Sequence, residues 1–306
     1  MAKLLTIGVP VYNGAATLRQ ALDSLLAQDY SPLEVIISDN NSTDASPTIC
    51  LEYAEHDPRI RYHRSEENRG AVWNFNRVAT LARGTYFMWG AHDDLWDPRF
   101  ASRCIAALEA DPTAVACHTF TQGIGTDGHS IGDLYDSHAN DGEDMVERWR
   151  LMMERWELHA AIYGVLRTSA LNQTRLIQPG LGCDFVFVSE LALRGKILQL
   201  PEVLSWKRVP DQGTAYRTPD EMLTYLGGSK SRPTLIRMQI LRACLRGLAH
   251  AKPELKSRLR MIGHTIAVYV RDNHWRADLS QELTDLLGES TLRAILRAVR
   301  RRPPMG

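Results

Sequence analysis

The sequence predicts an α/β fold with a mostly parallel central sheet flanked by helices, followed by a C-terminal helical region. Short apolar runs rich in β-branched residues, such as LLTIGVPVY (4–12), LEVIISD (33–39) and TYFMWGA (85–91), are typical of buried strands. Segments with apolar residues at helical spacing separate these runs. Strands and helices that alternate in this way form β-α-β units, whose strands are parallel and whose crossovers are right-handed.

The other elements of the first 120 residues continue this alternation. A helix is expected over 16–28, because its leucines recur at helical spacing. Asp44 or Ser46 is suited to cap the next helix, with Pro47 in its first turn. Further strands are expected at IRYHR (60–64) and AVACHTF (114–120), with a helix over 70–83 that Gly84 ends.

The pattern after residue 120 is less regular. The segment 121–142 is polar and rich in Gly, Asp and Ser, so a loop is expected there. A helix over about 143–157 and a strand at AAIYGVL (160–166) follow. Then come a loop feeding a helix, GLGCDFVFVSELALRGK (180–196), and a strand, VLSWKRV (203–209). From Pro219 the pattern is helical, and one apolar stripe contains Leu255, Leu259, Ile262, Ile266 and Val270.

Composition indicates a globular protein with an uneven distribution of charge. The 306 residues are 44% apolar and 24% charged, with a formal net charge of zero. Residues 230–306 nevertheless carry 16 Lys and Arg against 6 Asp and Glu. The five cysteines form no C-x-x-C pair, which argues against a disulfide framework or a zinc site. No apolar run has the length of a signal peptide or a bilayer span, so we expect a cytoplasmic protein.

Polar residues follow three of the predicted strands at the point where each strand ends. PVYN (10–13) ends the first, Asp39 ends the second, and Asp93 follows the strand at 85–91. Ligands of parallel α/β sheets bind at the carboxyl ends of the strands. These residues therefore predict a nucleotide or cofactor pocket with acidic side chains.

Four motifs together resemble the family 2 glycosyltransferases. They are VPVYN (9–13), SDNNSTD (38–44), NRGAVWNFNRVATLARG (68–84) and AHDD (91–94), in the order and spacing of that family. The resemblance implies the GT-A fold and transfer of a sugar from a nucleotide-sugar donor with inversion. It is good over 4–115 and looser to about residue 209, and the last 80 or so residues carry no motif of the family.

This resemblance implies a domain organisation. A GT-A domain is expected over 1–218, with a nucleotide half at about 1–120 and an acceptor half at about 121–218. Residues 219–306 form the C-terminal helical region with its basic tail.

The resemblance also assigns residues to the nucleotide. Pro10, Tyr12 and Asn13 match the segment that holds the base, and Asp39 matches the carboxylate that accepts a hydrogen bond from a pyrimidine ring. The alternative for Asp39 is a turn that caps the next helix. Asn68 and Asn76, with Gly70 and Gly84, match the Asn-x-Gly…Asn…Gly framework of the family, in which Asn76 holds loops near the donor or lies on a helix surface.

The AHDD stretch matches the metal-binding motif of the family. Asp93 is assigned to Mg²⁺ or Mn²⁺, which grips the donor diphosphate; such sites use one or two carboxylates plus substrate phosphates. The first Asp of the motif is Ala91 here, which puts ribose recognition in doubt, and His92 substitutes for it in part. Asp94 is expected to order the turn. The alternative is a plain pair of Asp residues that ends a strand.

Asp184 matches the general base of the family, which takes the proton of the acceptor hydroxyl. Its alternative role is the N-cap of the helix it opens, and Glu190 is the rival base. Arg208 matches a basic residue near the diphosphate, although Pro210 stands where the family often has His.

Several aromatic and histidine residues have open interpretations. Core packing or a sugar site is expected for Trp73, Trp89 and Trp96. Trp149 and Trp156, which lie seven residues apart in a predicted helix, either face the acceptor or have a purely structural role. No ligand spacing relates His118, His129 and His138.

The expected function is that of an inverting, metal-dependent glycosyltransferase. Its donor would be of the UDP or dTDP type, and its acceptor a saccharide or a lipid-linked molecule in surface polysaccharide or glycolipid synthesis. One alternative is a sugar nucleotidyltransferase, which should have a Gly-rich loop after the first strand, where PVYNGAAT has one Gly. Another is a non-catalytic nucleotide-sugar binder, which Ala91 permits.

The basic C-terminal region, which ends RAILRAVRRRPP (293–304), is either a solvated helical cap or a peripheral contact with an anionic membrane at its inner face. No nucleic-acid partner is expected.

Overall fold

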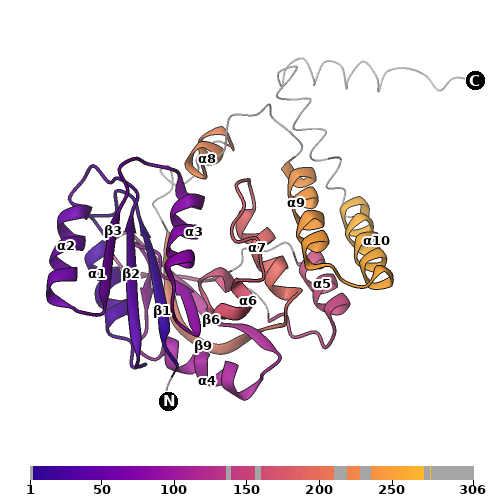
Figure 1. Cartoon of the computed structure of the whole chain (residues 1–306), viewed down its shortest axis with the longest axis horizontal. Helices are drawn as coiled ribbons and strands as arrows, with labels where there is room; N and C mark the ends of the chain where they lie inside the picture. Colours follow the sequence, from indigo (N-terminus) through magenta and orange to yellow (C-terminus); the bar gives the residue numbers. More distant parts are fainter. Residues whose placement is uncertain are drawn as a thin grey trace, which may run out of the picture.

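The chain is an α/β protein in which helices cover both faces of a central sheet (Figure 1). Its computed structural model describes residues 3–135, 139–155, 160–209, 219–227, 236–271 and 276. Two helices of the C-terminal region, α9 and α10, lie together at one side of the sheet, whereas α8 lies apart from them near α3 (Figure 1).

Nine strands of the described residues form one sheet, in the order β3-β2-β1-β4-β8-β6-β9-β5, with β7 paired to β6. Parallel pairs join β1 to β2 and β4, β2 to β3, and β6 to β9. β8 is antiparallel between β4 and β6. The predicted α/β fold with a central sheet flanked by helices is confirmed, and the sheet is mixed, because β5 with β9 and β7 with β6 also form antiparallel pairs. The strands are β1 (Leu5–Val11), β2 (Leu33–Asp39), β3 (Ile60–Arg64), β4 (Tyr86–Trp89), β5 (Leu95–Trp96), β6 (Ala114–Ile124), β7 (Ser130–Tyr135), β8 (Val165–Arg167) and β9 (Lys196–Arg208).

Apolar side chains form a core on each face of the sheet. On one face β1 and β2 pack against α1, α2 and α4, and on the other Trp89 packs among residues of α3, α5 and α7. α3 lies directly on the β1 backbone, because a Cβ added to Gly8 would lie 2.7 Å from Cβ of Val78. The helices are α1 (Leu18–Leu26), α2 (Ser46–His56), α3 (Ala71–Leu81), α4 (Phe100–Ala110), α5 (Met145–Glu154), α6 (Thr168–Leu171), α7 (Cys183–Ala192), α8 (Pro219–Tyr225), α9 (Ile236–Ala251) and α10 (Leu255–Arg271), with a 3₁₀ turn at Ala160–Tyr163.

Two expectations for the second half of the sheet are wrong. The segment 121–142 contains a hairpin, since β6 continues to Ile124 and β7 returns antiparallel to it. Its turn is made by Asp127, which accepts from the backbone N–H of His129, and by Gly128 with φ of 85°. The Gly and Asp residues of this turn suggested a loop. The expected strand at 160–166 is a 3₁₀ turn followed by β8, because Gly164 breaks the strand by closing a turn onto Ala161.

The C-terminal helices extend the core on the α7 side. α9 packs against α7 and α10 against α5. Trp149 of α5 is fully buried, and its indole N–H donates to Thr265 of α10 over 2.8 Å. The hypothesis that Trp149 faces an acceptor is therefore wrong, whereas Trp156 and His138 lie outside the described residues. In the described residues, none of the helices combines the length and apolarity that crossing a bilayer requires.

The Trp149–Thr265 hydrogen bond should contribute measurably to stability. Thr265→Val removes the hydroxyl and leaves a buried indole N–H without an acceptor, so we expect a loss of about 1–3 kcal/mol in the free energy of unfolding. Urea unfolding measures it. Thr80→Val is the matched control, since the Thr80 hydroxyl also donates within its own helix but is exposed. Equal losses in both variants would contradict the role of the hydrogen bond.

Candidate functional site

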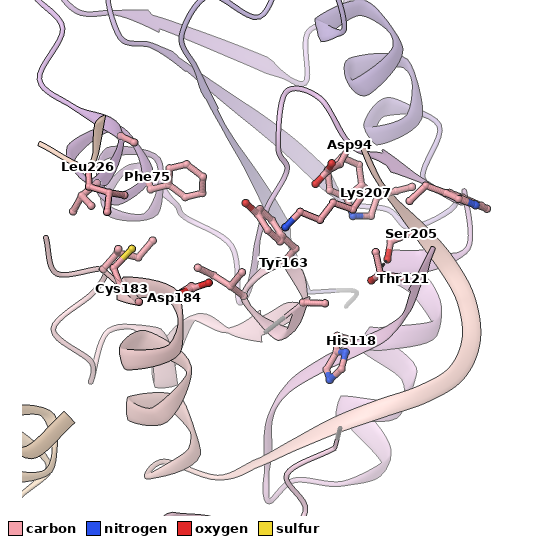
Figure 2. Close-up of a pocket in the computed structure, with 18 of the residues that line it drawn as sticks. Phe75, Asp94, His118, Thr121, Tyr163, Cys183, Asp184, Ser205, Lys207 and Leu226 are labelled. Atoms are coloured by element: carbon pink, nitrogen blue, oxygen red, sulfur yellow. Dashed lines mark hydrogen bonds between the residues drawn. The ribbon is translucent and has the colours of Figure 1, made fainter. Parts of the chain in front are cut away.

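Two cavities meet at the carboxyl ends of the central strands. The larger cavity has a volume of about 740 Å³ and lies over the ends of β1 and β4. The smaller cavity has about 400 Å³ and is bordered by β6, β9 and the start of α7. Asp94, Tyr163, Lys207 and Tyr225 line both cavities. The two spaces therefore share one wall of polar and aromatic side chains. Figure 2 shows Asp94, Tyr163 and Lys207 of this wall.

The carboxyl end of β1 and the residues that follow it reach the larger cavity through two of the three residues predicted there. Pro10 and Tyr12 line it, and Tyr12 is 38% exposed. Asn13 instead fixes the backbone, with φ of 52° in the left-handed region. Its N–H donates to Ser42 Oγ over 2.9 Å, and its Oδ1 accepts from the N–H of Thr43 over 2.8 Å. Asn13 thus ties the loops after β1 and β2 together.

Asp39 is fully buried at the end of β2, and it is not among the residues that line the larger cavity. Its Oδ1 accepts from the N–H of Ser42 over 2.9 Å, and its Oδ2 accepts from the Tyr62 hydroxyl over 3.0 Å. Arg64 Nε lies 3.5 Å from the same Oδ2. The carboxylate thus orders the turn after β2, as its alternative role required, but it does not cap α2; contact with a base stays a prediction.

The carboxylate of Asp44 stabilises the start of α2, although the N-cap itself is the next residue. Ala45 is the N-cap of α2, and Asp44 Oδ1 accepts from the N–H of Ser46 over 2.9 Å. Oδ2 of Asp44 accepts from Ala15 over 3.0 Å. Asp44 therefore joins the helix start to the loop after β1.

Asparagine side chains hold the backbone that borders the larger cavity. Asn68 Oδ1 accepts from Asn40 Nδ2 over 2.8 Å and from the N–H of Gly70 over 2.9 Å. Asn40 and Asn68 both line the cavity. Asn76 does not line it; its amide donates to the backbone oxygen of Ile177 and accepts from the same residue's N–H, over 2.8 and 3.0 Å. Asn76 therefore holds the loop that leads into α7.

The Asp pair after β4 has two different environments. Asp93 lines the larger cavity, and no donor of the described residues contacts its carboxylate. Asp94 is 7% exposed, and its Oδ1 accepts from the backbone N–H of Arg208 over 2.9 Å. Burial, with the adjacent charge of Asp93, raises the pKa of Asp94 to about 7. His92 and Ala91 line the larger cavity beside them.

Arg208 is 8% exposed and its guanidinium is occupied by protein acceptors. It donates to the backbone oxygens of Asp93, Gly125 and Thr126 and to Oε1 of Gln20, all over 2.9–3.0 Å. The neighbouring Lys207 is exposed and lines both cavities. Sequence reasoning missed Lys207, because the motif match fell on the next residue.

Asp184 lines the smaller cavity from the first turn of α7 (Figure 2). The N-cap of α7 is Gly182, with φ of 68°, so the alternative that Asp184 is the N-cap is wrong. Its Oδ1 accepts from the N–H of Phe185 over 2.8 Å. A carboxylate in the first turn is stabilised as an anion by the helix dipole.

Glu190 lies at the other end of the same helix and is 2% exposed. Its Oε1 accepts from Arg175 Nε and Nη2 over 2.8 and 2.6 Å, and Oε2 accepts from the Arg175 N–H. It lines neither cavity. Glu190 thus belongs to a buried ion pair, and the geometry favours Asp184 over it as a group that can meet a substrate.

Tyr163 lies between Asp94 and Asp184 (Figure 2). No motif in the sequence pointed to it. It closes the 3₁₀ turn before β8, where sequence reasoning expected a strand interior. Burial raises the pKa of its hydroxyl, and the charges of Asp94 and Asp93 raise it further. Tyr163 therefore keeps its proton and can donate a hydrogen bond at the junction of the cavities.

The tryptophans divide between core and cavity. Trp89 is fully buried and makes edge contacts with Phe87 and Phe187, while Trp73 packs between Arg69 and Arg77. Trp96 lines the smaller cavity, as does His118. In the described parts of the chain, no group of three or more His, Cys, Asp or Glu side chains has the arrangement of a metal site.

Comparison with known proteins identifies the family. Residues 6–160 match the model of Glycosyl transferase family 2. The chain belongs to this family. The resemblance to family 2 glycosyltransferases is therefore confirmed, and the motifs from VPVYN to AHDD lie inside the matched residues.

Relatives of the chain include an uncharacterised protein of Mycobacterium tuberculosis, 35% identical over 205 residues, which are 63% of this chain and 55% of that protein. Glycosyltransferase GlyA of Streptococcus pneumoniae is 31% identical over 147 residues, 47% of this chain and 21% of GlyA. The chain thus spans about half of the mycobacterial relative and a smaller part of the streptococcal one.

Solved structures share the fold. Staphylococcus aureus TarS residues 1–349 superpose with a TM-score of 0.62 at 15% identity, over 87% of this chain and 72% of that one. A mannosyltransferase of Pyrobaculum calidifontis, in complex with GDP-Man and Mn²⁺, gives 0.54 at 18% identity, over 93% and 88%. The expected GT-A fold is confirmed.

The Glu190–Arg175 pair should matter for stability and not for turnover. Glu190→Gln removes the buried carboxylate and leaves the guanidinium of Arg175, which is only 20% exposed, without its counter-charge, so we expect a loss of roughly 3 kcal/mol in the free energy of unfolding. Glu52→Gln is the control, because Glu52 pairs with Arg19 at the surface, where each side chain is nearly half exposed; its loss should be below about 1 kcal/mol. A Glu190→Gln protein as stable as the wild type would contradict this assignment.

Proposed function

We propose that the chain is an inverting, metal-dependent glycosyltransferase that takes a UDP- or dTDP-type nucleotide-sugar. The acceptor is a saccharide or a lipid-linked molecule of surface polysaccharide or glycolipid synthesis. The observation that carries this proposal is the meeting of the two cavities, one bordered by Asp93 and the other by Asp184, at Tyr163 and Lys207. Binding of UDP and UDP-GlcNAc by TarS, and of GDP-Man by the archaeal relative, supports a nucleoside diphosphate donor.

The larger cavity suits the nucleoside diphosphate. Pro10, Tyr12 and Asn68 border one part of it, and His92 and Asp93 border another. The exposed ammonium of Lys207 is free to approach an anion there, whereas Arg208 holds the loop that carries Asp93. We assign the diphosphate contact to Lys207 and the placement of the Asp pair to Arg208. Most of the residues that line this cavity belong to 1–120, the proposed nucleotide half of a GT-A domain over 1–218, whereas Lys207 and Arg208 come from the proposed acceptor half.

The residues present fit a divalent cation whose other ligands come from the substrate. Asp93 offers a carboxylate with no protein donor among the described residues, and Mg²⁺ sites commonly need only one or two carboxylates beside phosphates. When bound, Mg²⁺ or Mn²⁺ would offset charge on the leaving diphosphate. Mn²⁺ in the archaeal relative is consistent with this choice.

The smaller cavity suits the acceptor. Transfer with inversion is a single displacement: the acceptor oxygen bonds to the anomeric carbon as the bond to the diphosphate breaks. Asp184 accepts the proton of that hydroxyl. Tyr163, still protonated, donates to an oxygen at the junction of the cavities. Mostly apolar walls, with Trp96 and Phe75 among them, suit the C–H faces of sugars.

The metal assignment predicts a binding effect that needs no turnover. Asp93→Ala should abolish the strengthening of UDP binding by Mn²⁺, because the cation loses its protein ligand. Asp94→Asn should lose less, since Asp94 already accepts from Arg208. Calorimetric titration of UDP with and without Mn²⁺ measures both. Equal Mn²⁺-dependent binding by wild type and Asp93→Ala would reject the assignment.

The base assignment predicts a loss of turnover without a loss of donor binding. Asp184→Asn keeps the size and the hydrogen bond to Phe185, but the amide cannot accept the proton, so nucleoside diphosphate release with acceptor should fall by ~10²–10⁴. UDP affinity should stay within a few-fold. A folded Asp184→Asn enzyme with near wild-type turnover would remove Asp184 from the reaction.

A further inference from the structure

α10 carries a stripe of apolar side chains on its outward face. Of eight large apolar side chains that are exposed in the described residues, four belong to this helix. Their spacing places them along one face of the helix. Two of the other four, Tyr12 and Tyr225, line the cavities. The stripe consists of Leu255, Leu259, Ile266 and Val270, which are 71, 59, 49 and 55% exposed.

The opposite face of α10 is held by the core. Met261, Thr265 and Val268 are at most 3% exposed, and Thr265 accepts from the indole of Trp149. Rotating the helix to bury the stripe would expose these residues and break that hydrogen bond. The stripe is therefore a fixed outer surface, and Figure 1 shows α10 at the edge of the molecule, on the side away from α2.

Positive charge accompanies the stripe. Lys256, Arg260 and Arg271 are exposed, and their spacing places them together along one flank of it. From residue 236 to 271 the chain has eight Lys and Arg and a single acidic residue, Glu254. An apolar stripe bordered by basic residues is typical of a helix that lies in the interface of a bilayer with anionic headgroups.

We propose that α10 docks the chain on an anionic lipid surface. The apolar stripe inserts to the level of the acyl-chain boundary, and the basic flank contacts headgroup phosphates. The helix of 17 residues is about 25 Å long and lies parallel to the membrane plane. A second copy of the chain fits this face poorly, because two such faces would bring their basic flanks together. This docking does not require a bound donor or acceptor. The proposal places the membrane contact on α10; the basic tail at 293–304 lies outside the described residues.

Co-sedimentation of the full chain with vesicles tests the proposal. The wild type should bind vesicles of phosphatidylcholine mixed with phosphatidylglycerol, should not bind phosphatidylcholine alone, and should dissociate as salt rises. Leu259→Asp should weaken binding by roughly tenfold, and Lys256→Gln by about fivefold. Leu51→Asp is the matched control: Leu51 is 51% exposed on α2, and its substitution should change nothing. Circular dichroism checks that the variants are folded.

Three outcomes would overturn the docking of α10 on lipid. One is equal binding to both kinds of vesicle, or binding to neither. Another is wild-type binding by Leu259→Asp, which would assign the contact to residues outside α10. The third is a wild-type dimer in light scattering that Leu259→Asp converts to a monomer, which would assign the stripe to a second copy. Loss of turnover in Asp184→Asn leaves this test unaffected, so the two proposals fail separately.

Discussion

The buried guanidinium of Arg208 joins four segments that are far apart in the sequence. Its donors reach α1 through Gln20, the hairpin turn through Gly125 and Thr126, and the loop after β4 through the Asp93 oxygen. A guanidinium has five N–H groups in a rigid plane, and four of them are used here. Because a buried charge without acceptors is costly, these segments must stay together for Arg208 to remain buried. The position of the Asp pair, and hence of the wall between the cavities, depends on this one group.

The cost of burying the Arg208 cation is offset mainly by hydrogen bonds to backbone oxygens and not by an ion pair with a carboxylate. The carboxylate of Asp94 accepts from the backbone N–H of Arg208, and burial with the adjacent charge of Asp93 raises its pKa to about 7 although Lys207 and Arg208 act to lower it. Asp93 keeps its carboxylate clear of protein donors in the described residues. Two adjacent aspartates thus differ in character, because the carboxylate of Asp94 is buried and accepts from β9, whereas that of Asp93 has no donor among the described residues.

Much of the fold follows from local patterns in the sequence. Short apolar runs rich in β-branched residues, such as LEVIISD, are typical of buried strands, and the turn residues after them fall at the edge where a parallel sheet binds ligands. The same reasoning failed at 121–142, where Gly128 and Asp127 form a hairpin turn inside a segment too polar to look like a strand. A strand at the margin of a sheet is specified by its neighbour, which a local pattern does not contain.

The site was only partly predictable for a similar reason. Motif positions gave Asp93 and Asp184, which both line cavities. They did not show that Asp39 accepts from Tyr62, or that Glu190 pairs with Arg175, because those partners come from other elements. Tyr163 and Lys207 carry no motif, and only the meeting of the strands places them between the cavities.

The two-sided contact between Asn76 and Ile177 has a consequence for the timing of the reaction cycle. The side-chain amide of Asn76 both donates to and accepts from the backbone of Ile177, as paired residues of two strands do. These two hydrogen bonds fix the separation of α3 and the loop before α7 before any substrate binds. α3 borders the larger cavity, proposed for the donor, and α7 carries Asp184, the proposed base, so the contact joins the elements that would hold these two groups. An error of about 1 Å between reacting groups can cost 10²-fold in rate. A chain that sets this spacing during folding has no need to re-establish it at each encounter with a sugar.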